Sequence, residues 1–94
     1  MITELTTQHD SRKSFYGKAK VIVEGNKISL QSYTTIVAEI SNGVAKVFGT
    51  YSPTTLRHIK EFLQQNNFEI GTSKQIMEMY GVEEWKILIL YKLY

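Results

Sequence analysis

The chain contains no cysteine, which excludes disulfide bonds and thiolate metal sites. Its longest uninterrupted apolar run is the five residues 87–91, far too short to span a membrane. The first ten residues lack a basic start followed by an apolar core, so they predict no signal peptide. Net charge is only +2, which is too weak to indicate nucleic acid by itself and opposite in sign to a DNA mimic. The lack of cysteine is compatible with a reducing cytoplasm.

What remains is the composition of one small globular domain. The 94 residues are 43% hydrophobic and 21% charged, both ordinary fractions for a folded chain with one modest core. Residues 1–14 are polar and aperiodic, and predict a flexible N-terminal arm that orders only against the domain or a partner. Residues 15–94 are predicted to form a single domain.

The clearest predicted helix lies within residues 51–67. Ser52 can cap its first turn, and Pro53 suits the first helical position because the missing N–H costs nothing there. An apolar stripe follows at helical spacing: Leu56, Ile59, Phe62 and Leu63. This stripe predicts that the helix packs its apolar side on the rest of the domain.

Four alternating segments before this helix predict strands, at residues 18–24, 27–31, 35–40 and 44–50. Gly25-Asn26 and Asn42-Gly43 are hairpin signals, and Ser32-Tyr33-Thr34 is a weaker turn signal, for which the alternative is a bend in one long strand. Together these turns predict an antiparallel meander. In the third strand, alternation places Ile36, Ala38 and Ile40 on the core side.

Two further elements are predicted after the main helix. Ser73 is expected to cap a second, short helix that stops at Gly81. Residues 85–94 predict a C-terminal strand whose one face is wholly apolar: Trp85, Ile87, Ile89, Tyr91 and Leu93. The predicted class is therefore α+β, a four-stranded antiparallel meander with one main helix on a face, a short helix and a terminal strand.

The polar side of the main helix is the first candidate site. It carries Thr54, Arg57, His58 and Glu61, which predict a rigid surface for a partner. Arg57 and His58 near a helix start can also favour an anion. The alternative is a solvated face on which Arg57 and Glu61 form an ordinary i,i+4 pair.

A second candidate site interleaves basic and aromatic residues before and within the first predicted strand. Its members are Arg12, Lys13, Tyr16, Lys18 and Lys20. Such a pattern can bind phosphates and stack on the bases of a single strand. The alternative is a solvated strand edge whose lysines discourage aggregation.

No catalytic constellation is recognisable in the sequence. Glu83 and Glu84 are adjacent, so on a strand they point to opposite faces and form no carboxylate pair. The chain has no glycine-rich phosphate loop, no nucleophile elbow and no metal-ligand spacing around its two histidines. We therefore expect a non-enzymatic protein with no cofactor and no metal.

Three stretches carry a resemblance to a known family: residues 14–19 (SFYGKA), 30–40 (LQSYTTIVAEI) and 51–62 (YSPTTLRHIKEF). They resemble small proteins of no established activity carried by phages and mobile elements of Gram-positive bacteria. The resemblance implies a cytoplasmic protein acting in an infected host cell. Phage proteins of this size often bind other proteins, including as inhibitors of host defence systems such as CRISPR nucleases.

Two functions follow as expectations. The leading one is a phage-encoded protein-binding module, an inhibitor of a host defence system, that contacts a host or phage protein. The alternative is a nucleic-acid-binding accessory protein that uses the basic and aromatic N-terminal segment. The apolar segment 85–94 also predicts a homodimer, unless the segment is buried within its own domain.

Overall fold

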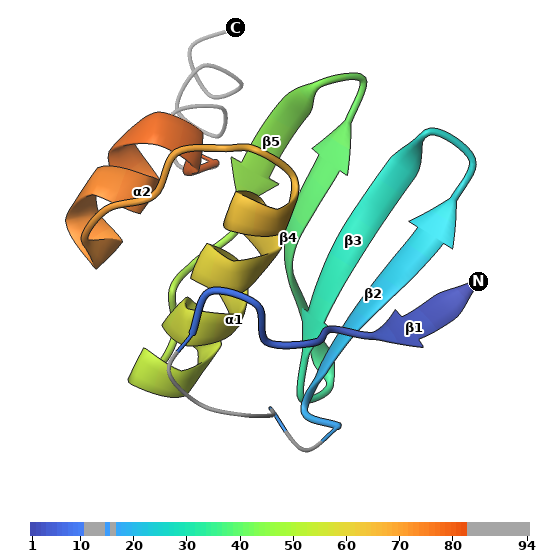
Figure 1. Ribbon diagram of the computed structural model, residues 1–94. Coiled ribbons are helices and arrows are strands. Elements are labelled where there is room, and N and C mark those ends of the chain that lie inside the picture. Colours follow the sequence, from blue (N-terminus) through green and yellow to red (C-terminus); the bar gives the residue numbers. More distant parts are fainter. Residues whose placement is uncertain (11–14, 16, 83–94) are drawn as a thin grey trace, which may run out of the picture.

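The computed structural model describes residues 1–10, 15 and 17–82 of the chain. Within them, one antiparallel sheet runs in sequential order, with the strands β1 (Ile2–Glu4), β2 (Ala19–Glu24), β3 (Lys27–Ser32), β4 (Thr35–Ser41) and β5 (Val44–Val47). Helices α1 (Pro53–Gln65) and α2 (Ser73–Tyr80) follow. Helix α1 lies across one face of the sheet, with α2 beyond it near β5 (Figure 1). The predicted α+β class and meander are confirmed, and the strand predicted for 85–94 lies outside the described residues.

Both predicted hairpin turns are present. Asn42 and Gly43 have positive φ angles of 52° and 76° between β4 and β5, and Gly25 has a φ of 58° between β2 and β3. Positive φ at the centre of a two-residue turn matches the twist of the strands it joins. Glycine and asparagine reach this region at low cost, which explains why these dipeptides mark the turns.

The N-terminal segment differs from the predicted arm, because residues 1–10 belong to the domain. Ile2–Glu4 form β1, which pairs with β2 in the register Thr3↔Val21. The amide of Leu5 then donates to Ala19 O at 2.9 Å, and the Leu5 side chain is buried. A three-residue strand exposed along its whole length has no apolar alternation, so its sequence carries no strand signal.

Strand β4 contains a bulge that reverses the side-chain phase predicted for its first half. Leu30 pairs with Ala38 but Gln31 pairs with Ile36, so Val37 is the extra residue. As a result Val37 is 1% exposed and Ile36 is 38% exposed, and the prediction that Ile36 faces the core is wrong. A bulge shifts the inward–outward alternation of side chains by one residue, and no residue type in this strand indicates its position.

The core lies between the sheet and α1. Ile59, Phe62 and Leu63 of the predicted stripe are fully buried, together with Leu30 and Val47 of the sheet. The cap is also as predicted: Ser52 Oγ accepts the Thr55 N–H at 3.1 Å, and Pro53 occupies the first turn.

The second helix starts one residue earlier than predicted. Its cap is Thr72 rather than Ser73, because the Thr72 hydroxyl accepts the Gln75 N–H at 3.2 Å while the Gln75 side chain accepts the Thr72 N–H at 2.9 Å. This reciprocal capping box needs Gln three residues after the cap, a spacing that Thr72 satisfies. Ile76 anchors α2 in the core.

Candidate functional site

His58 was predicted on the open side of α1, and the structure corrects this placement. The side chain is completely buried, beneath Phe15, whose ring centroid lies 4.5 Å from the imidazole in an edge-to-face arrangement. His58 follows Thr55 by three residues and precedes Phe62 by four, so it shares their buried side of the helix. That spacing is the signal in the sequence that could have revealed its burial.

A chain of hydroxyl groups inside the domain ends on His58. Ser52 Oγ donates to Thr55 Oγ1 at 3.2 Å, Thr55 Oγ1 lies 2.9 Å from Ser32 Oγ, and Ser32 Oγ lies 2.8 Å from His58 Nδ1. A hydroxyl group both donates and accepts, so these contacts join Ser52, Thr55, Ser32 and the imidazole in one hydrogen-bonded chain with either neutral tautomer of His58.

The environment of His58 favours the neutral ring. Burial lowers its pKa below the ordinary value of 6.5, the charge of Lys18 lowers it further, and Asp10 acts in the opposite direction. Within the described residues Nε2 has no hydrogen-bond partner. The arrangement resembles a catalytic Ser–His pair only in composition, because both Ser32 and His58 are closed off from solvent.

Glu61 was also predicted on the open side of α1, and it too is buried, with 1% exposure. Its Oε1 atom accepts the backbone N–H groups of Gln8, His9 and Asp10 at 2.7, 2.7 and 3.1 Å. Its Oε2 atom accepts the Gln65 side-chain amide at 2.9 Å. The predicted Arg57–Glu61 pair is therefore replaced by a clasp in which one carboxylate holds residues 8–10 against the helix.

The clasp keeps Glu61 ionised. Burial alone raises its pKa, but the hydrogen bonds from residues 8–10 and from Gln65 outweigh that effect, so the net pKa lies below the ordinary 4.5. Gln65 also donates to Thr6 O at 2.6 Å, which extends the attachment along the N-terminal segment.

A groove of about 220 Å³ lies between the clasped segment and the outer side of α1. Its lining consists of His9, Asp10, Arg57, Lys60, Glu61, Gln64 and Ile70. The Arg57 side chain keeps 40% exposure, and its Nε lies 3.8 Å from Asp10 Oδ2. Of the four predicted helix residues, Thr54 and Arg57 reach the surface, whereas His58 and Glu61 do not.

The predicted basic segment is only partly described. Lys18 and Lys20 are exposed, and Lys18 Nζ lies 5.9 Å from the centre of the Tyr33 ring, which is 47% exposed. Phe15 is buried in the core, so its ring is closed to bases. Arg12, Lys13 and Tyr16 lie outside the described residues.

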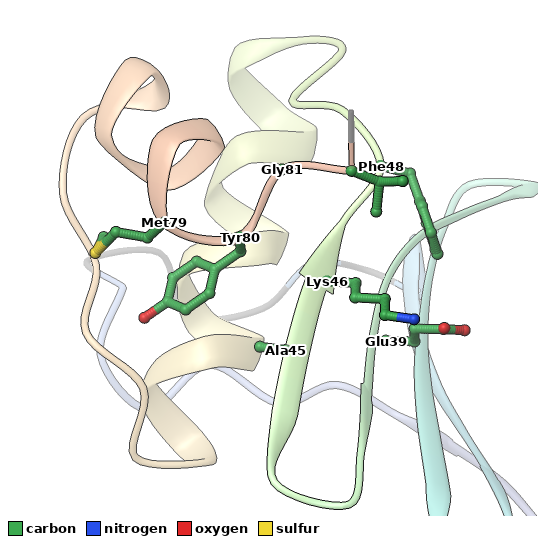
Figure 2. A pocket seen from close by; sticks show the side chains of 8 residues that line it. Glu39, Ala45, Lys46, Phe48, Met79, Tyr80 and Gly81 are labelled. Carbon is green, nitrogen blue, oxygen red and sulfur yellow. The ribbon is translucent and has the colours of Figure 1, made fainter. Parts of the chain in front are cut away.

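A second groove, of about 400 Å³, follows the side of β5 that faces away from β4. Its lining residues are Glu39, Ala45, Lys46, Phe48, Met79, Tyr80, Gly81 and Val82. Figure 2 shows Met79 and Tyr80 of α2 on one side of β5, and Lys46 with Glu39 on the other. The groove therefore reaches both faces of the sheet edge.

Two further features, a metal-binding cluster and a membrane-spanning helix, are absent from the described residues. No group of three or more His, Asp or Glu side chains there could hold a metal ion. None of the helices found there is long and apolar enough to cross a membrane.

The fold and the clasp define a small α+β domain built on a five-stranded antiparallel meander. Residues 3–79 match a family of unknown function, DUF8033, and because the match covers most of the chain, the protein belongs to that family. No curated protein and no solved structure matches the chain.

Proposed function

We propose that this protein is a small non-enzymatic protein-binding module, with its contact surface on the outer side of α1 and residues 8–10. The observation that carries the proposal is the clasp at Glu61, in which three backbone N–H groups converge on one buried carboxylate. These hydrogen bonds hold the irregular segment 8–10 on the rigid helix α1 in the absence of a partner. Such preorganisation reduces the entropy lost on binding.

The chemistry of this surface suits an acidic partner. Arg57 and Lys60 line the groove, and the Glu61 carboxylate is buried, with its oxygens already bonded to residues 8–10 and Gln65. Asp10 lies against Arg57 and is mostly buried, at 12% exposure, which orients the guanidinium while leaving part of it open. A carboxylate on the partner can then bind the exposed side of Arg57.

The narrower proposal is that the partner is part of a host defence system, such as a CRISPR nuclease, and that binding inhibits it in the host cytoplasm. The resemblance of residues 14–19, 30–40 and 51–62 to phage-carried proteins supports this context. The mild positive charge points away from DNA mimicry and toward a protein contact.

A pull-down from infected host cells, with and without nuclease, tests the proposal. The tagged wild-type chain should retain a nuclease-resistant partner, and the double variant Arg57→Glu/Lys60→Glu should lose it. Lys27→Glu is the matched control, because Lys27 is exposed at the start of β3, away from the groove. Equal recovery with the double variant overturns the proposed surface. Purified protein that leaves a host CRISPR nuclease fully active overturns the narrower proposal for that nuclease.

The second candidate function is nucleic-acid binding near β2. The specific observation is the exposed group formed by Lys18, Lys20 and Tyr33, next to the basic residues Arg12 and Lys13 in the chain. Binding to a single-stranded oligonucleotide at low salt should then be lost in Lys18→Glu/Lys20→Glu. Each phosphate contact contributes a log–log salt slope of about −0.7 on a single strand. No binding at low salt removes this candidate.

A further inference from the structure

Among the described residues, β5 is the last strand of the sheet, and no other strand pairs with its outer side. Backbone groups in an antiparallel strand point alternately toward and away from the neighbouring strand. Phe48 N–H donates to Val37 O on the β4 side, whereas Val47 C=O accepts from Val82 N–H on the opposite side. Two residues before Val47, Ala45 shares its orientation and presents its N–H and C=O to the groove, where the described residues place no further strand.

The walls of this groove are mostly apolar side chains. Phe48 and Val82 lie at one end, and Met79, which is 44% exposed, comes from α2. Val44, at the start of the same strand, is 56% exposed. Unpaired edge backbone beside exposed apolar groups is the usual template for adding a strand.

We propose that the groove beside β5 binds residues 85–94 of a second copy of this chain, so that two copies exchange their C-terminal segments. The proposal concerns a different surface from the α1 groove and does not rest on the function proposed above. The segment has apolar residues at alternate positions, as a strand bound in an apolar groove requires. Because Val47 C=O is already bonded to Val82 N–H, the segment pairs with β5 at Ala45, and its other residues extend past the Val44 end of the strand.

The direction of the chain favours a second copy over the same copy. Gly81 pairs with Val47 in parallel, so the chain at Val82 runs in the direction of β5, toward Phe48 and away from Ala45. The same copy would have to reverse after Val82 to reach Ala45. A segment from a second copy can enter from the open end, and reciprocal exchange gives a closed twofold dimer.

Cysteine crosslinking identifies the occupant, since the chain has no cysteine of its own. Full-length Met79→Cys is mixed with a size-tagged Ile89→Cys chain and treated with a short bismaleimide. We expect a crosslinked product that contains both chains. A third chain carries both Met79→Cys and Ile89→Cys. If crosslinks form only within this chain, the segment binds its own copy and the proposal is overturned. Absence of both products also overturns it. Lys27→Cys, exposed at the start of β3, is the control position.

Sedimentation of full-length variants provides an independent measurement. Wild type should be a dimer, and Ala45→Pro should be a folded monomer, because proline is tolerated at an edge position whose N–H is unpaired. Ile87→Glu/Ile89→Glu should also be monomeric, whereas Lys86→Glu/Lys92→Glu, on the other side of the predicted strand, should remain dimeric. The segment variants decide the result if Ala45→Pro does not fold. A wild-type monomer at high concentration overturns the proposal.

Discussion

The hydroxyl of Ser32 lies 2.8 Å from Nδ1 of His58 and joins β3 to α1 inside the core. Through Thr55 the same contact extends to the cap residue Ser52, so the start of the helix and its buried histidine form one hydrogen-bonded unit. Such a unit fixes the position of the helix on the sheet, because apolar packing alone is not directional.

Replacing His58 by alanine should therefore destabilise the fold strongly. The change leaves a cavity and removes one of the two hydrogen-bond partners of Ser32, losses that together cost about 2–4 kcal/mol of unfolding free energy. Denaturant titration measures the free energy of unfolding of the variant and of wild type. His9→Ala is the control, since His9 is exposed and should shift stability by no more than about 0.5 kcal/mol. A small, equal effect of both changes contradicts the buried unit.

Stability should fall as the pH drops through the range in which free histidine titrates. The unfolded chain takes up a proton on His58 near pH 6.5, whereas the folded chain, with a lowered pKa, does not until a lower pH. The unfolded state then binds more protons, so unfolding free energy decreases with falling pH by up to about 1.4 kcal/mol per pH unit.

NMR titration of the imidazole and unfolding curves between pH 5 and 8 measure this effect directly. In His9→Gln the single remaining imidazole signal belongs to His58, because the chain has two histidines. A His58 ring that titrates at or above 6.5 in the folded chain would falsify the assignment of a neutral buried histidine.

Glu61→Gln should loosen the N-terminal segment. The amide keeps one acceptor oxygen but loses the negative charge that three N–H groups bind, at a cost of about 2–3 kcal/mol. Hydrogen exchange should show lost protection of the amides of residues 8–10. Glu24→Gln, at an exposed position, should leave them protected.

From the lowered pKa of the Glu61 carboxylate we predict a second loss of stability at acidic pH. Because the folded pKa of Glu61 lies below 4.5, its contribution is present above that pH and is lost as the pH falls through the folded value. Since the ordinary pKa is 4.5 for Glu61 and 6.5 for His58, the loss of stability from Glu61 begins at a lower pH than the loss from His58. Unfolding curves of Glu61→Gln below pH 4.5 should be flatter than those of wild type, and identical slopes count against the clasp.

Local signals predicted much of the fold, because the turns, the caps and the main stripe each depend on a few neighbouring residues. Asn42-Gly43 and Ser52-Pro53 are such signals, and both act as predicted. The side chains of the candidate site were harder to place. Helix α1 packs on the sheet, Phe15 and Ser32 cover His58, and the segment 6–10 covers Glu61, so both side chains are buried on flanks that an amphipathic pattern leaves open.

The final prediction compares the two positions at the bulge in β4. Alternation assigns Ile36 to the core, whereas the observed register assigns Val37, at 1% exposure. Val37→Ala should therefore cost roughly 1–3 kcal/mol through lost burial and a residual cavity, and Ile36→Ala should cost less than about 1 kcal/mol despite deleting more atoms. Thermal unfolding of the two variants beside wild type decides between the registers. If Ile36→Ala lowers thermal stability more than Val37→Ala does, β4 has no bulge, and the residues on the outer face of the sheet must be reassigned.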